Sequence, residues 1–211
     1  MSDLARQLSS DLAPVQRGLV LRRLLFGLGG GLAASIVLVL LILGPRPDMS
    51  GAMDTAMFWM KLLYPLSLVA IALLAAERLA RPAASARSRL AWLPLPFVLV
   101  ALLALVVFIL AQPAARETIL MGQSARVCPF IVLASAVPPL AGLVWAMRGL
   151  APTRLAETGA VIGLAAGGAG AFAYAWHCTE AGAPFLAIWY TLGIAAAALL
   201  GGLIGPRTLR W

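Results

Sequence analysis

The chain has 211 residues, of which 62% are hydrophobic and 11% are charged, and its formal net charge is +8. Soluble globular domains and disordered chains carry far more polar and charged residues, so this composition excludes both classes. The basic residues lie in short segments between apolar stretches, which is not the footprint of a nucleic-acid-binding protein.

The N-terminal tail, residues 1–23, is the longest polar segment of the chain. Leu4, Leu8 and Leu12 recur at a spacing that places them on one face of a helix, and Pro14 disfavours its continuation. A helix of about ten residues is not stable alone in water. The tail therefore needs an apolar surface, and three candidates remain open: the membrane surface, its own helix bundle and a groove on a partner protein.

Six apolar stretches follow the tail, and each is long enough to cross a lipid bilayer, which takes ~20 helical residues. Backbone polar groups in lipid must be paired within the segment, so each stretch is predicted to be a helix. Short loops make neighbouring helices antiparallel. The stretches are residues 24–44, 58–76, 90–111, 127–147, 155–176 and 185–205. We predict an all-α fold, a transmembrane bundle of six helices over residues 24–205, with a C-terminal tail at 206–211.

The positive charge predicts the orientation of this bundle. Twelve of the 16 basic residues lie on the side that carries the N-terminus, and Lys and Arg are retained on the cytoplasmic side of membranes. Both termini are therefore expected in the cytoplasm, most simply at a bacterial inner membrane. The first stretch ends at Gly44-Pro45 without a small-residue cleavage pattern, which favours an uncleaved signal anchor.

Small residues and prolines within the stretches predict how the helices pack. Pro138 and Pro139 fall in the middle of the fourth stretch and are expected to kink it. GxxxG spacing, which permits close helix packing in lipid, occurs at Gly27 and Gly31, Gly163 and Gly167, and Gly201 and Gly205.

Ionisable residues are nearly absent from the apolar stretches. No Asp, Glu, Arg or His lies well inside any stretch. Lys61 lies near a predicted outer end, where we expect its ammonium group to extend to the membrane surface. Ion-coupled transporters and pumps keep ionisable groups at membrane depth, so this pattern counts against active transport. The sequence has no recognisable catalytic triad, phosphate loop or carboxylate pair. We therefore expect neither an enzyme nor a bound cofactor.

The only two cysteines, Cys128 and Cys178, are predicted to meet at the outer face. Counted outward from the inner loop 148–154, they lie ~20 and ~24 residues away, or ~30 and ~36 Å along their helices. Thiols on that side of the membrane can be oxidised. His177 and Glu180 flank Cys178, and an imidazole can favour the thiolate that attacks oxidants and binds soft metals.

Three interpretations of this pair remain open. It is a redox- or soft-metal-responsive pair, a constitutive structural disulfide, or two unrelated small residues at helix ends. A closed zinc site is disfavoured, because four ligands of fitted spacing are needed and the only candidates are Cys128, His177, Cys178 and Glu180. A thiol oxidoreductase that passes electrons to quinone is also disfavoured, because it normally needs a Cys-x-x-Cys motif or a second cysteine pair.

Several residue clusters, in order along nearly the whole chain, match one known family. They are Asp3-Leu4, Leu8, Asp11-Leu12, Pro14-Val15, the run from Leu43 to Asp48, the run from Phe58 to Leu62, Cys128, the run from Trp145 to Thr153, the run from Tyr174 to Glu180, Trp189-Tyr190 and Arg210-Trp211. With these clusters the chain resembles the NrsF-like anti-sigma factors, six-span proteins of bacterial inner membranes that restrain an extracytoplasmic-function sigma factor.

The resemblance implies roles for two sets of residues. The tail would bind the sigma factor, with candidate contacts at Asp3, Leu4, Leu8, Asp11, Leu12, Pro14 and Val15. The outer cysteines, Cys128 and Cys178, would sense oxidant or soft metal, with His177 and Glu180 beside them. Partners would then be the sigma factor and the lipid bilayer, without direct contact to nucleic acid. Two other functions remain in competition: a structural or assembly protein of the membrane, and a subunit of a small-molecule transporter.

Overall fold

The structure is a computed structural model that describes residues 18–81, 86–150 and 152–210. Within these residues every regular element is a helix and there is no β-strand, so the predicted all-α fold is confirmed. Six helical segments are long and apolar enough to span a membrane: Leu19–Ile42, Ala56–Leu79, Ser88–Leu110, Cys128–Arg148, Leu155–Ala175 and Ala183–Thr208. The chain is an integral membrane protein by this criterion.

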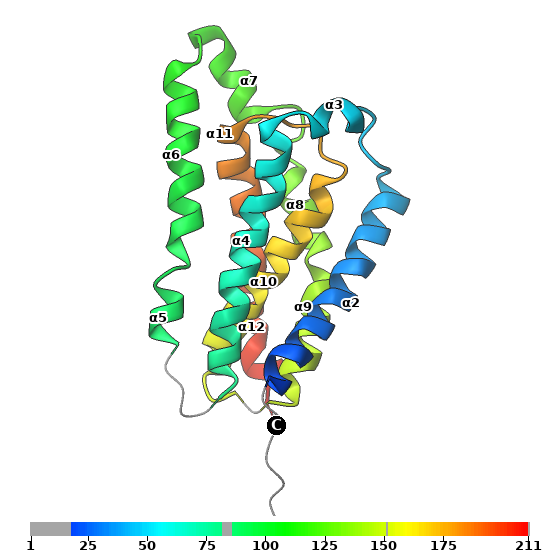
Figure 1. Cartoon of the computed structure of the whole chain (residues 1–211), viewed down its shortest axis with the longest axis vertical. Coiled ribbons are helices and arrows are strands. Elements are labelled where there is room, and N and C mark those ends of the chain that lie inside the picture. The colour runs from blue at the N-terminus through cyan, green and yellow to red at the C-terminus, as the bar shows by residue number, and fades with distance from the viewer. Residues whose placement is uncertain (1–17, 82–85, 151, 211) are drawn as a thin grey trace, which may run out of the picture.

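The long helices are α2 (Leu19–Ile42), α4 (Ala56–Leu79), α6 (Pro94–Leu110), α8 (Cys128–Ser135), α9 (Val137–Arg148), α10 (Leu155–Ala175) and α12 (Thr191–Thr208). Short helical elements join or extend them: α3 (Met49–Met53), α5 (Arg87–Leu90), η1 (Pro113–Ala115), α7 (Arg116–Met121), α11 (Ala183–Phe185) and the π-helical turn η2 (Leu186–Tyr190). Figure 1 shows α3 and α7 at one end of the bundle, opposite the C-terminus. We call that end the outer end and the opposite end the inner end, after the topology predicted from the sequence.

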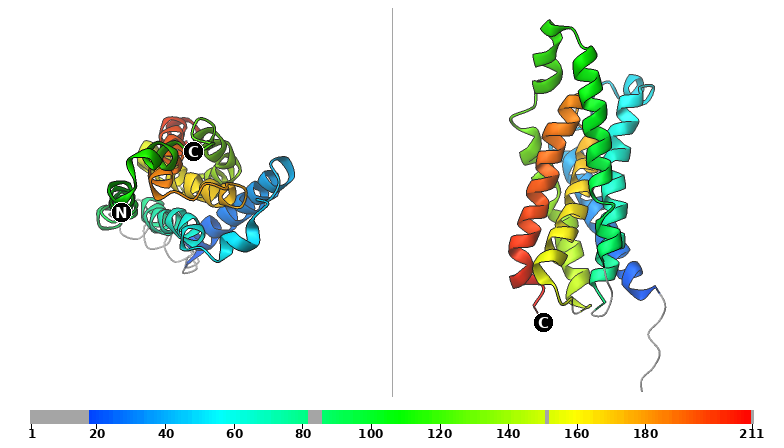
Figure 2. Two further views of the ribbon diagram at one scale, coloured as in Figure 1. Left: turned by 90° about the horizontal axis from the view of Figure 1, so that it is seen from above. Right: turned by 90° about the vertical axis from the view of Figure 1, so that its left-hand side faces the viewer.

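Helix α10 is the central helix of the bundle (Figure 2), where it packs against α12, α4, α9, α8 and α2. Its apolar segment is 89% buried inside the protein, whereas the segment that contains α6 is only 17% buried. Helix α6 stands at the edge, beside α4, α11 and η2. The sequence of α10 is rich in Gly and Ala, so that neighbouring helices can approach it from several sides.

Glycines allow two of the helix pairs to pack closely. A methyl group at Gly201 of α12 would collide with the backbone of Gly159 in α10, and one at Gly163 would collide with Ala197. Likewise Gly27 of α2 packs directly on the backbone of Gly142 in α9. The close packing predicted from GxxxG spacing is present, although its partners include glycines outside those motifs.

The predicted kink lies between α8 and α9. Pro139 has no N–H to donate to the carbonyl of Ser135 four residues earlier, so the helical ladder is interrupted there. The hydroxyl of Ser35 in α2 donates instead to the Ser135 carbonyl, at 2.7 Å. A side chain from a neighbouring helix thus satisfies an acceptor that lipid could not.

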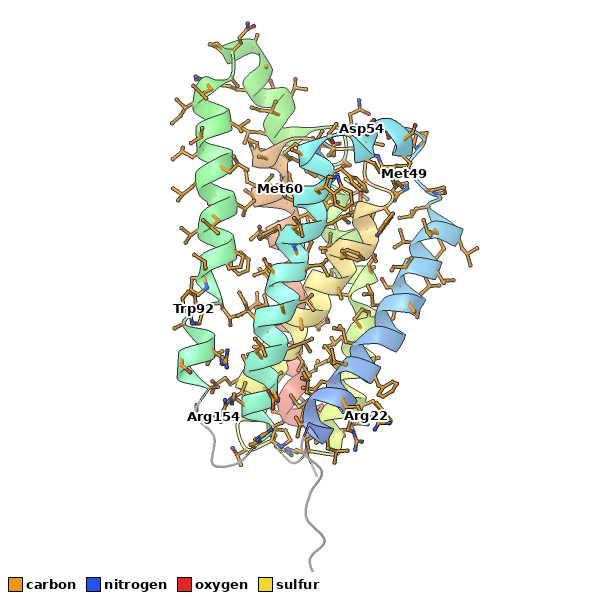
Figure 3. All side chains as sticks on the ribbon, viewed as in Figure 1. Arg22, Met49, Asp54, Met60, Trp92 and Arg154 are labelled. Carbon is orange, nitrogen blue, oxygen red and sulfur yellow. The ribbon has the colours of Figure 1, made fainter. Side chains whose placement is uncertain are left out.

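Helix α2 begins at Leu19, five residues earlier than the predicted first span at residue 24. The helix therefore includes Arg22 and Arg23, whose guanidinium groups stack over the rings of Phe26 and Trp145. Figure 3 places Arg22 and Arg154 at the inner end and Asp54 and Met49 at the outer end. Residues 1–17 lie outside the described residues, and with them every predicted partner contact in the tail.

Candidate functional site

Cys128 and Cys178 converge at the outer end of the bundle. Cys128 is the first residue of α8, and Cys178 follows α10, its N–H still bonded to the carbonyl of Tyr174 at 3.0 Å. Both are buried, with exposed fractions of 0% and 3%, within one hydrophobic cluster. Both thiols are free, and each lies within electrostatic range of the other. The two cysteines, expected at a similar depth from counting residues, thus lie in one cluster at the outer end.

Two tyrosines and a lysine surround the sulfurs. The rings of Tyr174 and Tyr190 lie 5.8 Å apart, and both side chains lie close to Cys178. The hydroxyl of Tyr190 is buried and has no hydrogen-bond partner among the described residues. Tyr190 ends the π-helical turn η2, and such turns re-aim side chains at functional sites. The pair therefore lies in a packed apolar cluster that contains a few polar atoms.

The side chain of Lys61 does not extend to the membrane surface as predicted. Its side chain is buried, with 2% exposed, and its ammonium group donates hydrogen bonds to the main-chain carbonyls of Cys178, at 2.8 Å, and Glu180. It also lies 5.6 Å from the centre of the Tyr190 ring. The expectation that Lys61 extends to the membrane surface was wrong, because the loop after α10 folds over α4 and supplies these carbonyls.

Glu180 holds together the two chain segments that carry the cysteines. Its carboxylate accepts hydrogen bonds from the N–H groups of Gln123 and Ser124, at 2.7 and 3.0 Å, and from the Ser124 hydroxyl, at 3.0 Å. Ser124 in turn accepts the N–H of Cys128, at 2.8 Å. Gly122 precedes these amides with φ 50°, and any side chain there would collide with the carboxylate. Glu180 is thus a bridge between the two loops.

His177 is positioned by the loop after α2. Its Nδ1 lies 2.9 Å from the carbonyl oxygen of Gly44, and its ring is 5.8 Å from that of Tyr174. In the same loop the N–H of Arg46 donates to the carbonyl of Trp176, at 3.0 Å. These bonds attach the loop to the outer end of α10.

Arg46 and Asp48 form an ion pair on this loop. Two hydrogen bonds of 2.8 and 2.7 Å join the guanidinium to the carboxylate. The bonded guanidinium lowers the pKa of Asp48, and the bonded carboxylate raises the pKa of Arg46. The Arg46 guanidinium also lies over the ring of Phe58 in α4.

The predicted sensor residues therefore come together, but in two groups. Cys128 and Cys178 lie in the same buried cluster, whereas the side-chain partners of His177 and Glu180 are backbone groups and Ser124. Within the part of the chain that the structure describes, no group of three His, Cys, Asp or Glu residues is placed to hold a metal. Two thiolates could still bind a soft metal ion between them.

Sequence reasoning missed Lys61, Tyr190 and Ser124 as neighbours of the cysteines. Tyr174 carried a usable signal, because it lies four residues before Cys178 and so shares its face of the helix. Ser124 carried the same kind of signal, because it lies four residues before Cys128 and accepts its N–H. Lys61 and Tyr190 belong to other helical elements, and no local pattern places them at the sulfurs.

Comparison with known proteins gives a consistent result over the whole length. The family described as negative regulator of sigma F, NrsF, matches residues 8–211. The probable anti-sigma-F factor NrsF of Azospira oryzae is 35% identical over 209 residues, which cover 99% of this chain and 98% of that relative. The anti-sigma-F factor NrsF of Caulobacter vibrioides is 37% identical over 212 residues, with the same coverage of both chains. No solved structure matches the chain.

Proposed function

The chain belongs to the NrsF family and is an anti-sigma factor, and we propose that it restrains an extracytoplasmic-function sigma factor at the cytoplasmic face of a bacterial inner membrane. The predicted orientation, with both termini inside, puts the tail in the sigma factor's compartment and the cysteines on the opposite side of the membrane. The cysteines would then detect the signal outside the cytoplasm, and the tail would release the sigma factor inside it.

The N-terminal tail is the proposed sigma-binding element. Leu4, Leu8 and Leu12 would form the apolar face of a short helix that lies in a groove of the sigma factor, beside Val15. Asp3, Asp11 and Pro14 complete the proposed contact set. Folding of the tail on its partner costs ordering entropy, which burial of the leucines would offset. Polymerase could not then bind the same sigma factor.

The cysteine pair is the proposed sensor. An oxidant such as a peroxide would take two electrons and two protons from Cys128 and Cys178, forming one disulfide while the peroxide is reduced to water. A soft metal ion would instead bind the two thiolates and displace their protons. Either event draws together the outer end of α8 and the loop after α10, which Glu180 and Ser124 already connect.

The helix contacts offer a route from the sensor to the tail. Cys128 begins α8, which continues through the proline kink into α9, and α9 packs closely on α2. Gly27 and Gly142 leave no free space in that contact, so a tilt of α9 would have to move α2. The tail is the direct N-terminal continuation of α2. Coupling of ~1–3 kcal/mol along this route would change sigma affinity by about 5- to 150-fold.

The observation that carries the sensor proposal is the meeting of the only two cysteines of the chain in one buried cluster at the outer end. Tail binding is tested separately, with the full chain in lipid nanodiscs and a purified extracytoplasmic-function sigma factor. Leu8→Asp should weaken binding by about tenfold or more, because a charge replaces a buried anchor. Gln7→Asp, which adds the same charge off the leucine face, is the matched control. Equal binding by both variants would remove the leucine face from the mechanism.

A further inference from the structure

A small pocket of about 150 Å³ lies at the outer end, between the loop after α2, the start of α4 and the loop after α10. Arg46, Asp48, Lys61 and Glu180 contribute to its lining. The proposed thiol chemistry does not use this pocket.

Lys61 provides a buried positive charge without a matching carboxylate. Its bonds go to two neutral carbonyls, and among the described residues no acidic side chain lies within salt-bridge distance of it. An ammonium group has three N–H donors, so one remains for a further partner. A buried charge that lacks a counter-ion is costly, and an anion from outside would reduce that cost.

Two further features add positive potential. Arg46 lines the pocket with a side chain that is only 6% exposed. The first turn of α4 also lines it, through Thr55 and Met57, and the N-terminal end of a helix carries partial positive charge. Thr55 caps only the N–H of Phe58, so other N–H groups of that turn lack a partner within the helix.

Asp48 is the acidic residue that opposes this potential. Its carboxylate bonds Arg46 while its side chain remains 58% exposed at the pocket. The Glu180 carboxylate is engaged elsewhere, by Gln123 and Ser124. Asp48 therefore neutralises Arg46, and Lys61 is left as the uncompensated charge.

We propose that this pocket binds a small oxyanion, with Lys61 as its main electrostatic partner. A volume of about 150 Å³ leaves room for a small tetrahedral oxyanion. A free phosphate or sulfate and the phosphate of a lipid headgroup share this chemistry. The proposal needs neither the sigma factor nor oxidation of the thiols, so it stands apart from the proposed function.

The test uses the full chain in nanodiscs of a neutral phosphatidylcholine. Inorganic phosphate and, separately, sulfate are titrated at constant ionic strength, and the thermal unfolding midpoint is followed. A saturable rise in the midpoint is expected for the wild type. Lys61→Met should weaken apparent binding by about tenfold or more, while Asp48→Asn, which removes the competing carboxylate, should tighten it by about fivefold. Arg126→Gln, a change at an exposed basic residue outside the pocket, is the matched control.

Nanodiscs that contain phosphatidylglycerol distinguish the two sources of phosphate. Stabilisation by this lipid that Lys61→Met removes, without an effect of free phosphate or sulfate, would assign the site to a headgroup. The proposal is overturned if neither anion nor lipid gives a saturable effect, or if Lys61→Met and Arg126→Gln behave alike. Should Lys61→Met fail to fold, unchanged affinity in Asp48→Asn would also overturn it.

Discussion

The carboxylate of Glu180 accepts hydrogen bonds from both the N–H and the hydroxyl of Ser124, each at 3.0 Å, although 55 residues separate the two in the chain. The bonded segments lead directly into Cys128 and out of Cys178. This contact therefore ties the two halves of the cysteine site together at the outer end. We therefore expect this contact to limit the access of reagents to the sulfurs.

Glu180→Ala should expose the thiols, because it removes three hydrogen bonds to the segment before Cys128. A loss of about 1–3 kcal/mol in local stability would accelerate maleimide labelling of the cysteines by about 5- to 150-fold. Glu180→Gln keeps an acceptor oxygen and should show a smaller effect. Glu117→Ala, at an exposed acid of α7, is the control, and labelling of Glu180→Ala at the rate of that control would contradict the role of the bridge.

Gly201→Ala should destabilise the bundle, because its methyl group would collide with the backbone of Gly159 at the contact of α12 and α10. Overpacking of this kind costs about 1–3 kcal/mol. Gly30→Ala in α2 is matched to it, since a methyl group there meets no atom within 4 Å. Unfolding of both variants in nanodiscs, followed by circular dichroism, measures the difference. Equal stabilities would show that the helix contact is looser than described.

The ion pair of Arg46 and Asp48 should make the outer loop sensitive to acid. Because the guanidinium lowers the pKa of Asp48 in the folded protein, the pair stabilises the fold above the ordinary aspartate pKa of about 3.9. That stability is lost as the pH falls through the lowered value. The midpoint of thermal unfolding should therefore decrease below about pH 4 more in the wild type than in Asp48→Asn. Parallel pH profiles of the two proteins would contradict this linkage.

The membrane spans could be predicted from the sequence because lipid leaves few alternatives to an apolar helix. The predicted ends of the spans were less accurate. The first span was predicted to begin after Arg22 and Arg23, because charged residues lower the hydropathy there. The backbone of α2 is nevertheless helical through both arginines, whose guanidinium groups lie over aromatic rings. The kink at Pro138 and Pro139 was predictable, because a missing N–H donor is a local property.

The neighbours of the cysteines were harder to predict. The depth of Cys128 and Cys178 follows from helix rise, so their meeting could be expected. The burial of Lys61 could not, because its partners are carbonyls of a loop that lies 117 and 119 residues further along the chain. Proximity in sequence suggested His177 and Glu180 as partners of the sulfurs, yet their own bonds are to the loops around the site.

The most direct test of the sensor mechanism compares sigma-factor binding to the reduced and oxidised protein. The full chain in nanodiscs is treated with a mild oxidant, freed of it, and titrated with the sigma factor. Oxidation should weaken binding by about 5- to 150-fold in the wild type. The double variant Cys128→Ser, Cys178→Ser should bind equally before and after treatment. Unchanged affinity of the oxidised wild type, with a disulfide between Cys128 and Cys178 verified by mass spectrometry, would contradict the mechanism.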